Sequence, residues 1–148
     1  MTDDLVAIAG SIRVSRETKA RLDAYVELLG KWNNRVNLVS PKSLPTIWTR
    51  HIADSAQIFD LAPDDASSWV DLGSGGGFPG LVCAILAAAR RPGLGFTLID
   101  SDHRKCQFLR TVTRELDLKV TVLPMRIEEA ALFPADVVSA RALAPLAA

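Results

Sequence analysis

The most constraining feature of the sequence is a glycine-rich segment that joins a short apolar run to a helical pattern. Residues 71–80 read Asp-Leu-Gly-Ser-Gly-Gly-Gly-Phe-Pro-Gly and continue the apolar run that begins at Trp69. Glycines allow positive φ angles and let a ligand approach the backbone closely. A turn of this kind between a strand and a helix is typical of the ligand-binding edge of an α/β fold. We therefore expect a small-molecule site at this turn.

Strand-like and helix-like segments alternate through the rest of the chain. Short apolar runs predict four strands, at residues 69–72, 96–99, 120–123 and 136–139. Apolar residues at helical spacing predict helices at 79–89 and 103–117. This alternation favours right-handed βαβ units and a parallel sheet. The predicted fold class is α/β, with a Rossmann-like domain over residues 68–148 in which four strands are visible.

Residues 1–67 are predicted to form an N-terminal helical segment packed on that domain. Ser15 is suited to cap a helix over residues 16–33, where apolar side chains recur at helical spacing. A second helix is expected from about residue 43 to about residue 60, with Pro45 in its first turn. Trp32 ends the first apolar stripe, and we interpret it as a core residue rather than a base-stacking platform.

Composition limits the class of protein. The longest apolar run is far shorter than the roughly 20 residues of a membrane-spanning helix, and the start of the chain is acidic where a secretion signal would be basic. The two cysteines, Cys83 and Cys106, lack metal-ligand or redox spacing. We expect a cytoplasmic protein with no metal and no membrane partner.

Charge is unevenly distributed along the chain, although the formal net charge is zero. Residues 10–50 contain eight Lys and Arg side chains against three acidic ones, whereas residues 51–148 contain nine against twelve. A basic N-terminal segment is consistent with RNA binding, but solvated helix faces would give the same pattern. If RNA binds there, Arg35 and Lys42 should contribute in a salt-sensitive way.

The glycine segment permits two classes of ligand. Gly75 to Gly80 fits G-x-G-x-x-G, so a dinucleotide is one candidate. However, Pro79 removes an amide donor that a pyrophosphate would need at the helix start, and the Asp71 carboxylate would repel it. S-adenosylmethionine carries no phosphate and has cationic sulfonium and ammonium groups. The Asp71 carboxylate suits such a ligand, so Asp71 and the segment around Gly73, Gly75 and Gly77 favour S-adenosylmethionine over a nicotinamide dinucleotide.

Two further positions are candidates for nucleoside contacts. Asp100 ends the second predicted strand, where an acidic side chain can accept hydrogen bonds from both ribose hydroxyls. Asp100 could instead cap the following helix, although Ser101 and Asp102 could also do so. Ile127 and Glu128 follow the third strand, where adenine would be expected to lie, but this segment could equally be a solvated helix start.

Six segments in this order resemble the ribosomal RNA small-subunit methyltransferase G family (RsmG, also called GidB). They are Lys31-Trp32-Asn33 with Asn37-Leu38, His51-Ile52-Ala53-Asp54-Ser55, residues 71–80, Leu98-Ile99-Asp100-Ser101, Arg126-Ile127-Glu128-Glu129 and Ser139-Ala140-Arg141-Ala142. The Gly-Phe-Pro-Gly form of the loop, combined with the upstream pieces, makes this resemblance specific.

The resemblance implies a class I methyltransferase that transfers a methyl group from S-adenosylmethionine to guanine N7 of bacterial 16S ribosomal RNA. It places cofactor contacts on Gly73, Phe78, Ile127, Glu128 and Arg141, with Asp100 on the ribose. The implied partner is 16S ribosomal RNA or the small ribosomal subunit, not DNA.

Family members continue through three more strands, so the resemblance implies an incomplete sheet here. We expect the fourth strand to be a poorly protected edge, or paired with a second copy, and methyl transfer to be weak at best. Two alternatives stay open: a methyltransferase acting on a small molecule or a protein, and a nonenzymatic nucleotide-binding or RNA-binding module.

The sequence shows no obvious catalytic base or nucleophile. Guanine N7 already carries an in-plane lone pair, so orientation of the reactants can supply most of the rate. Arg141 is a candidate for binding a phosphate, the cofactor carboxylate or guanine O6, although it could be a surface residue. His51, Asp54 and Ser55 share one helix face and either close the cofactor pocket or form a purely structural network.

Overall fold

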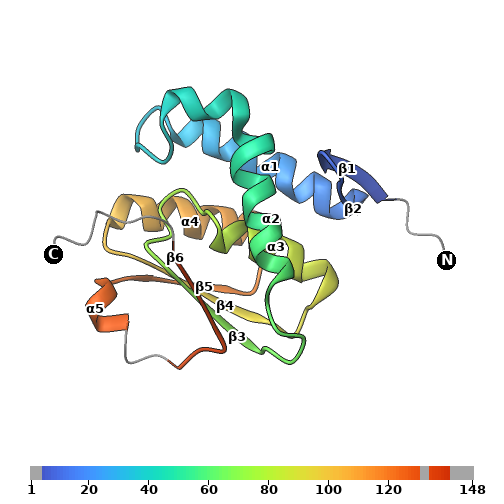
Figure 1. Ribbon diagram of the computed structural model, residues 1–148. Helices are drawn as coiled ribbons and strands as arrows, with labels where there is room; N and C mark the ends of the chain where they lie inside the picture. Colours follow the sequence, from blue (N-terminus) through green and yellow to red (C-terminus); the bar gives the residue numbers. More distant parts are fainter. Residues whose placement is uncertain (1–4, 131–133, 141–148) are drawn as a thin grey trace, which may run out of the picture.

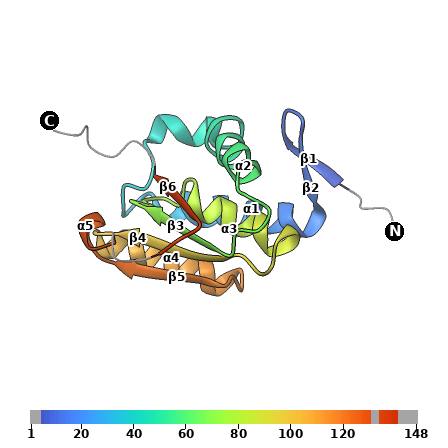
Figure 2. The same cartoon turned by 60° about the horizontal axis from the view of Figure 1, so that its bottom comes forward.

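A parallel four-stranded sheet forms the centre of the computed structural model, which describes residues 5–130 and 134–140 (Figure 1). The strands are β3 (Ser68–Leu72), β4 (Gly95–Asp100), β5 (Val120–Pro124) and β6 (Val137–Ala140). Their order, β5-β4-β3-β6, can be followed in Figure 2, and every pairing is parallel. The predicted α/β class is confirmed, and each strand begins and ends within one residue of its prediction.

Two layers of helices cover one face of this sheet. The inner layer consists of α3 (Gly80–Arg90), which contacts β4, and α4 (His103–Glu115), which contacts β4 and β5. The outer layer consists of α1 (Arg16–Trp32) and α2 (Ala53–Asp60), which pack on the inner helices (Figure 1). Buried side chains from both layers and the sheet make one continuous apolar core. The boundary between residues 1–67 and 68–148 stays a prediction, because one continuous core contains residues from both sides of it.

The two faces of the sheet are covered unequally. Alternate strand residues such as Trp69 and Leu98 lie in the main core, whereas Val70 and Ile99 belong to a smaller cluster with Ala130 of the short helix α5 (Ile127–Ala130). Helix α5 lies on the side of the sheet opposite α3 and α4 (Figure 1). Among the described strands β6 is an edge, and its Val138 is 61% exposed.

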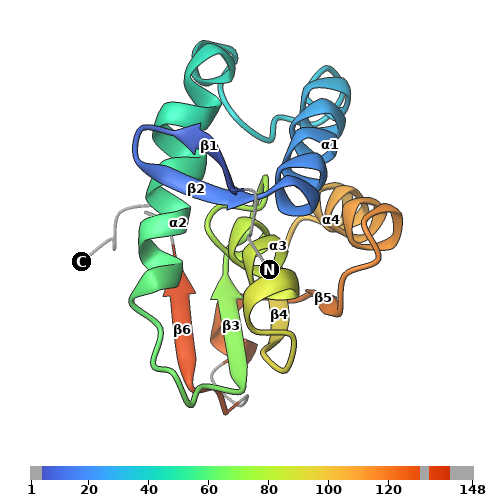
Figure 3. The same cartoon turned by 90° about the vertical axis from the view of Figure 1, so that its right-hand side faces the viewer.

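The N-terminal segment contains a hairpin that was not predicted from the sequence. Strands β1 (Leu5–Ala9) and β2 (Ile12–Ser15) pair antiparallel through a turn at Gly10, whose φ is +56°. Figure 3 shows this hairpin beside α1, which it contacts, and β1 also contacts residues Ile47–Ile52. The available signal was two β-prone runs separated by the pair Gly10-Ser11, a known hairpin connection. Helix α1 itself is confirmed, and its cap is Ser15, whose Oγ accepts the Thr18 amide at 3.1 Å.

The expected single helix over residues 43–60 is wrong. The chain instead forms a 3-10 helix, η1 (Pro41–Thr46), then a π-helical segment, η2 (Ile47–Ile52), and only then α2. Pro45 lies inside η1, where its missing N–H prevents a regular hydrogen-bond ladder. Within residues 5–130 and 134–140, every helix is too short or too polar to cross a membrane.

Candidate functional site

The glycine segment forms a loop at the carboxyl end of the two central strands. The amides of Gly73 and Ser74 both donate to the Ile99 carbonyl of β4, at 2.8 and 3.0 Å. Gly73 and Gly75 have positive φ angles of 69° and 53°, a conformation that favours glycine. A Cβ built on Gly75 meets nothing closer than 3.9 Å. The outer side of the loop at Gly75 is therefore open to a ligand.

Asp100, at the end of β4, is fixed by the same loop. Its Oδ2 accepts the Gly75 amide at 2.9 Å, and its Oδ1 accepts the Asp102 amide at 2.9 Å. The residue is 9% exposed. A carboxylate offers about four acceptor positions, so each oxygen retains the capacity to accept another hydrogen bond. The capping role belongs to Asp102, whose carboxylate accepts the Arg104 and Lys105 amides at the start of α4.

A hollow of about 400 Å³ opens between this loop and the turn that follows β5. The residues lining it are Gly73, Gly75, Asp100, Ser101, Lys105, Arg126, Ile127 and Glu128. The structure thus brings together five residues that the sequence singled out from three separate segments. Two acidic and two basic side chains border the hollow, so its rim offers partners to both signs of charge.

Asp71 lies beneath the loop rather than in the hollow. It is fully buried, and its carboxylate accepts the Ser74 hydroxyl at 2.7 Å, the Gly80 amide at 3.2 Å and the Ser139 hydroxyl at 2.7 Å. A Cβ on Gly80 would come within 2.4 Å of Asp71 Oδ2. Glycine at position 80 therefore lets the start of α3 sit directly on this carboxylate.

Gly77 and Phe78 also face the core and are not among the residues that line the hollow. Gly77 has a φ of 106°, and a Cβ there would lie 2.9 Å from both Leu81 Cβ and Tyr25 Oη. The Phe78 ring is 2% exposed and packs against Tyr25, at a centroid distance of 5.7 Å, and against His51, at 5.1 Å. Both residues are positioned to hold the loop from below.

Tyr25 supports the loop, a role that its position in the predicted helix over residues 16–33 does not reveal. Its hydroxyl donates to the Gly76 carbonyl at 2.6 Å, and both groups are buried. The phenol is the only hydroxyl-bearing aromatic ring in the sequence, and a buried tyrosine hydroxyl usually finds a hydrogen-bond partner. That expectation was the one available signal for its role.

His51, Asp54 and Ser55 do not form one cluster. Ser55 is buried, donates to the His51 carbonyl at 2.8 Å, and through its own carbonyl accepts the Cys83 thiol at 3.4 Å. The His51 ring packs on Phe78, whereas Asp54 is exposed. These contacts tie η2 and α2 to the loop and to α3.

The two cysteines are buried and unpaired. Burial, with the nearby Asp71 charge, raises the pKa of the Cys83 thiol well above its usual value. Burial also raises the pKa of Cys106 beneath the end of β4, and the Asp100 charge adds to the effect. Arg141, a candidate for positioning substrate or cofactor, lies outside the described residues.

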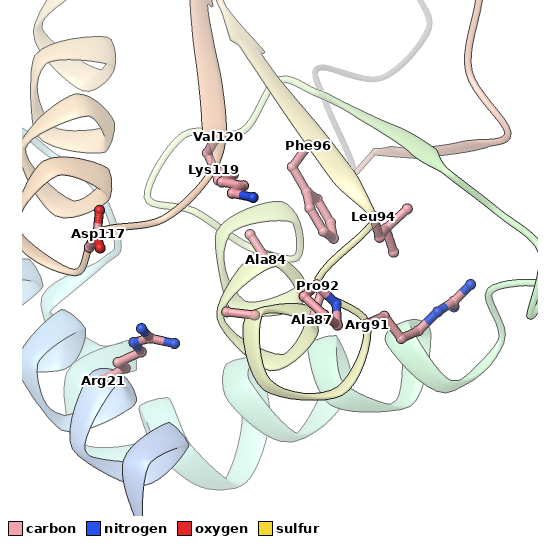
Figure 4. A pocket seen from close by; sticks show the side chains of 11 residues that line it. Arg21, Ala84, Ala87, Arg91, Pro92, Leu94, Phe96, Asp117, Lys119 and Val120 are labelled. Carbon is pink, nitrogen blue, oxygen red and sulfur yellow. The ribbon is translucent and has the colours of Figure 1, made fainter.

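A different hollow, of about 140 Å³, opens at the amino ends of β4 and β5 (Figure 4). Ala84, Ala87 and Phe96 line part of it, together with Arg21 and Lys119. Figure 4 shows the Arg91 side chain extending away from it, where its guanidinium donates to the Pro63 and Ala66 carbonyls. In parallel α/β sheets ligands bind at the carboxyl ends of strands. We therefore do not expect the cofactor in this hollow, which lies at the amino ends of β4 and β5.

Comparison with a solved structure supports the fold. The mitomycin 7-O-methyltransferase MmcR aligns over 84% of this chain and 40% of its own, with a TM-score of 0.51 and 20% sequence identity.

Comparison with curated sequences supports a narrower relationship. The chain is 53% identical over 136 residues to a ribosomal RNA small subunit methyltransferase G from Jannaschia sp. (strain CCS1), covering 92% of this chain and 64% of the relative. It is 51% identical over 142 residues to the protein of that name from Ruegeria pomeroyi, covering 96% of this chain and 69% of the relative. The chain thus spans about two thirds of the length of these relatives.

A family profile described as rRNA small subunit methyltransferase G matches residues 18–148, which include the glycine loop, Asp100 and the turn after β5. With most of the chain matched by this profile and about half of its residues identical to members, the chain belongs to the ribosomal RNA small subunit methyltransferase G family.

Proposed function

We propose that this chain binds S-adenosylmethionine in the hollow beside Gly75 and Asp100 and methylates guanine N7 of 16S ribosomal RNA. The observation that carries the proposal is the fixed Asp100 carboxylate, held by the Gly75 amide at the rim of a hollow that also contains Ile127 and Glu128. The substrate class comes from the family to which the chain belongs. With a ribosomal substrate, we expect the protein to act in the bacterial cytoplasm.

The residues present suit the nucleoside part of this cofactor. Asp100 keeps acceptor capacity on both oxygens and can take the two ribose hydroxyls. Ile127 lies across the hollow on the segment after β5 and can contact the adenine ring, with Glu128 beside it. Gly73 and Gly75 let the remaining part of the ligand approach the backbone.

The remaining predicted cofactor residues act through the loop. Asp71, Gly77 and Phe78 are buried beneath it and fix its path. The Asp71 carboxylate still contributes negative charge under a site that would hold a cationic ligand, and burial weakens solvent screening of that charge. We assign these three residues positioning roles rather than direct contacts.

The reaction requires the protein mainly to orient the two reactants. When bound, S-adenosylmethionine supplies a sulfonium methyl group that is already activated for displacement. Guanine N7 attacks with its own in-plane lone pair, so no side chain has to remove a proton. Holding two reactants in line can lower a barrier by roughly 7–11 kcal/mol in favourable cases. The loop and Asp100 fix one reactant, and we propose that Arg141 helps to position the other.

The proposal is tested by incubating this chain with S-adenosylmethionine labelled on the methyl group and with small-subunit ribosomal RNA, naked or assembled. The Ruegeria pomeroyi relative serves as a longer comparison. Label on guanine N7 of the RNA supports the proposal. Label on a small molecule or protein alone, or cofactor binding by neither chain, contradicts it. Cofactor binding without transfer would identify this chain as a binding module.

A further inference from the structure

A basic hollow lies between the end of α1 and the start of α4. Its volume is about 440 Å³, and it is lined by Lys31, Trp32, Arg35, Val36, Arg104 and Gln107. Three of these six side chains are cationic and none is acidic. Lys31 forms an ion pair with Glu27, at 3.3 Å, on the exposed side of α1. Glu27 thus offsets the charge of Lys31, and Arg35 and Arg104 carry the positive charge that attracts anions to this hollow.

The hollow is held open by contacts between its two walls. Arg104 donates through its guanidinium to the Arg35 carbonyl, which fixes one cationic side chain of α4 against the turn after α1. Asn33 shapes the same turn, because its side-chain oxygen accepts the Leu38 and Val39 amides at 2.9 and 3.0 Å. An arginine has five donors, so Arg104 retains others for a ligand.

Trp32 gives the hollow an aromatic wall. The indole packs on Phe108 with a centroid distance of 5.7 Å, yet it is only partly buried and contributes to the lining. Interpreting Trp32 as core alone is therefore incomplete. Cations that follow a phosphate backbone, combined with an aromatic ring on which a base can stack, are the features of single-stranded nucleic-acid sites.

The basic hollow and the hollow beside Asp100 both have the first turn of α4 as part of their lining. Arg104 lines the basic hollow, and the next residue, Lys105, lines the hollow beside Asp100. A strand of RNA on the basic hollow would thus be held next to the proposed methyl donor. We infer that the basic hollow binds a single-stranded segment of the RNA substrate, with phosphates on Arg35 and Arg104 and a base against Trp32. This inference rests on the proposed function.

The first test compares a variant that loses a charge inside the basic hollow with a variant that loses a charge outside it. Arg35→Gln should weaken binding of a fluorescently labelled single-stranded oligoribonucleotide severalfold and reduce the salt slope by about 0.7, the value for one lost phosphate contact on a single strand. Arg114→Gln, an exposed charge at the far end of α4, should bind like the unmodified chain. Equal effects of the two substitutions would overturn the inference.

The second test uses tryptophan fluorescence. RNA should quench the emission of the unmodified chain and of Trp48→Phe, but not the emission of Trp32→Phe, which keeps an aromatic ring against Phe108. Undiminished quenching in Trp32→Phe would show that no RNA base stacks on Trp32. S-adenosylmethionine titrations of the same proteins separate the two proposals. Arg35→Gln should bind the cofactor normally, whereas failure of the unmodified chain to bind it would overturn the proposed function and leave the RNA results standing.

Discussion

The Tyr25 hydroxyl donates a 2.6 Å hydrogen bond to the Gly76 carbonyl, although 51 positions separate them. This bond joins the outer helix α1 to the middle of the glycine loop. The outer helices are thus part of the support of the candidate cofactor site, because the loop would otherwise present a buried carbonyl without this donor.

Tyr25→Phe should destabilise the fold by about 1–3 kcal/mol, since it removes the hydroxyl donor from a buried acceptor. It should also weaken S-adenosylmethionine binding, because the loop loses an anchor. Urea unfolding and calorimetry measure the two effects. Unchanged stability together with unchanged affinity would show that the bond does not hold the loop.

Gly75→Ala should weaken cofactor binding, because the new methyl group would project from the open side of the loop. The positive φ at this position should cost about 1–2 kcal/mol of stability. Gly10→Ala is a matched control, since Gly10 has a similar φ of 56° and a Cβ built there meets no atom within 4 Å, but this glycine lies in the hairpin turn. Equal cofactor affinity in the two variants would contradict a ligand site at Gly75.

A side chain added at Gly75 and one added at Gly77 should have different effects. The structure separates the two glycines. A Cβ on Gly77 would collide with Leu81 and Tyr25, so a substitution there should destabilise the core first. Only Gly75 tests the ligand site cleanly.

Ser139→Ala should destabilise the protein by about 1–3 kcal/mol. The Ser139 hydroxyl donates to Asp71 at 2.7 Å and accepts the Trp69 indole N–H at 2.8 Å, and all three groups are buried. The substitution leaves both partners short of one hydrogen bond. Chemical denaturation measures the loss, with Ser11→Ala in the exposed hairpin turn as the control. Equal midpoints for the two variants would contradict this prediction.

Asp136 should make stability depend on acid pH. Its carboxylate accepts hydrogen bonds from the Ser67 amide and hydroxyl and from Ser68, and these bonds lower its pKa below the usual value. A lowered pKa in the folded state stabilises the fold above the unfolded-state pKa, and this stabilisation is lost as pH falls through the folded-state pKa.

Asp136→Asn should therefore lower the urea midpoint at neutral pH, and its difference from the unmodified chain should shrink in acid. Asp65→Asn is the control, because Asp65 is an exposed carboxylate close to the start of β3, where Ser67 and Ser68 lie. Parallel pH curves for Asp136→Asn and the unmodified chain would show that these hydrogen bonds do not favour the ionised form.

The sheet and its main helices follow from local signals. The apolar runs around Val70, Leu98 and Val122 are strong strand patterns, and the caps Ser15 and Asp102 mark true helix starts. Residues 41–60 were harder to predict, since segments of six residues are too short for apolar periodicity to distinguish 3-10, π and α helices, and tertiary packing selects among them. The hairpin was missed because a short β-rich run beside a helix carries little periodicity.

The candidate site was partly predictable for a similar reason. Asp100, Gly75 and Ile127 were found because each lies at or just after the carboxyl end of a strand. Sequence spacing could not reveal that the Asp71 carboxylate turns inward toward Ser139, or that Phe78 packs below the loop on His51. Direct contact and support from beneath give the same motif in a sequence, and only three-dimensional packing separates them.

The most direct test is calorimetric titration of S-adenosylmethionine into the unmodified chain, Asp100→Ala and Asp102→Ala. Asp102 carries the same charge two residues away but caps α4 and does not line the hollow. Asp100→Ala should lose about 1.5–3 kcal/mol of binding free energy, the scale of hydrogen bonds to a charged group, while Asp102→Ala should bind nearly as the unmodified chain does. Circular dichroism and thermal melts establish that each variant is folded. Unchanged affinity in folded Asp100→Ala would contradict the assignment of this hollow as the cofactor site.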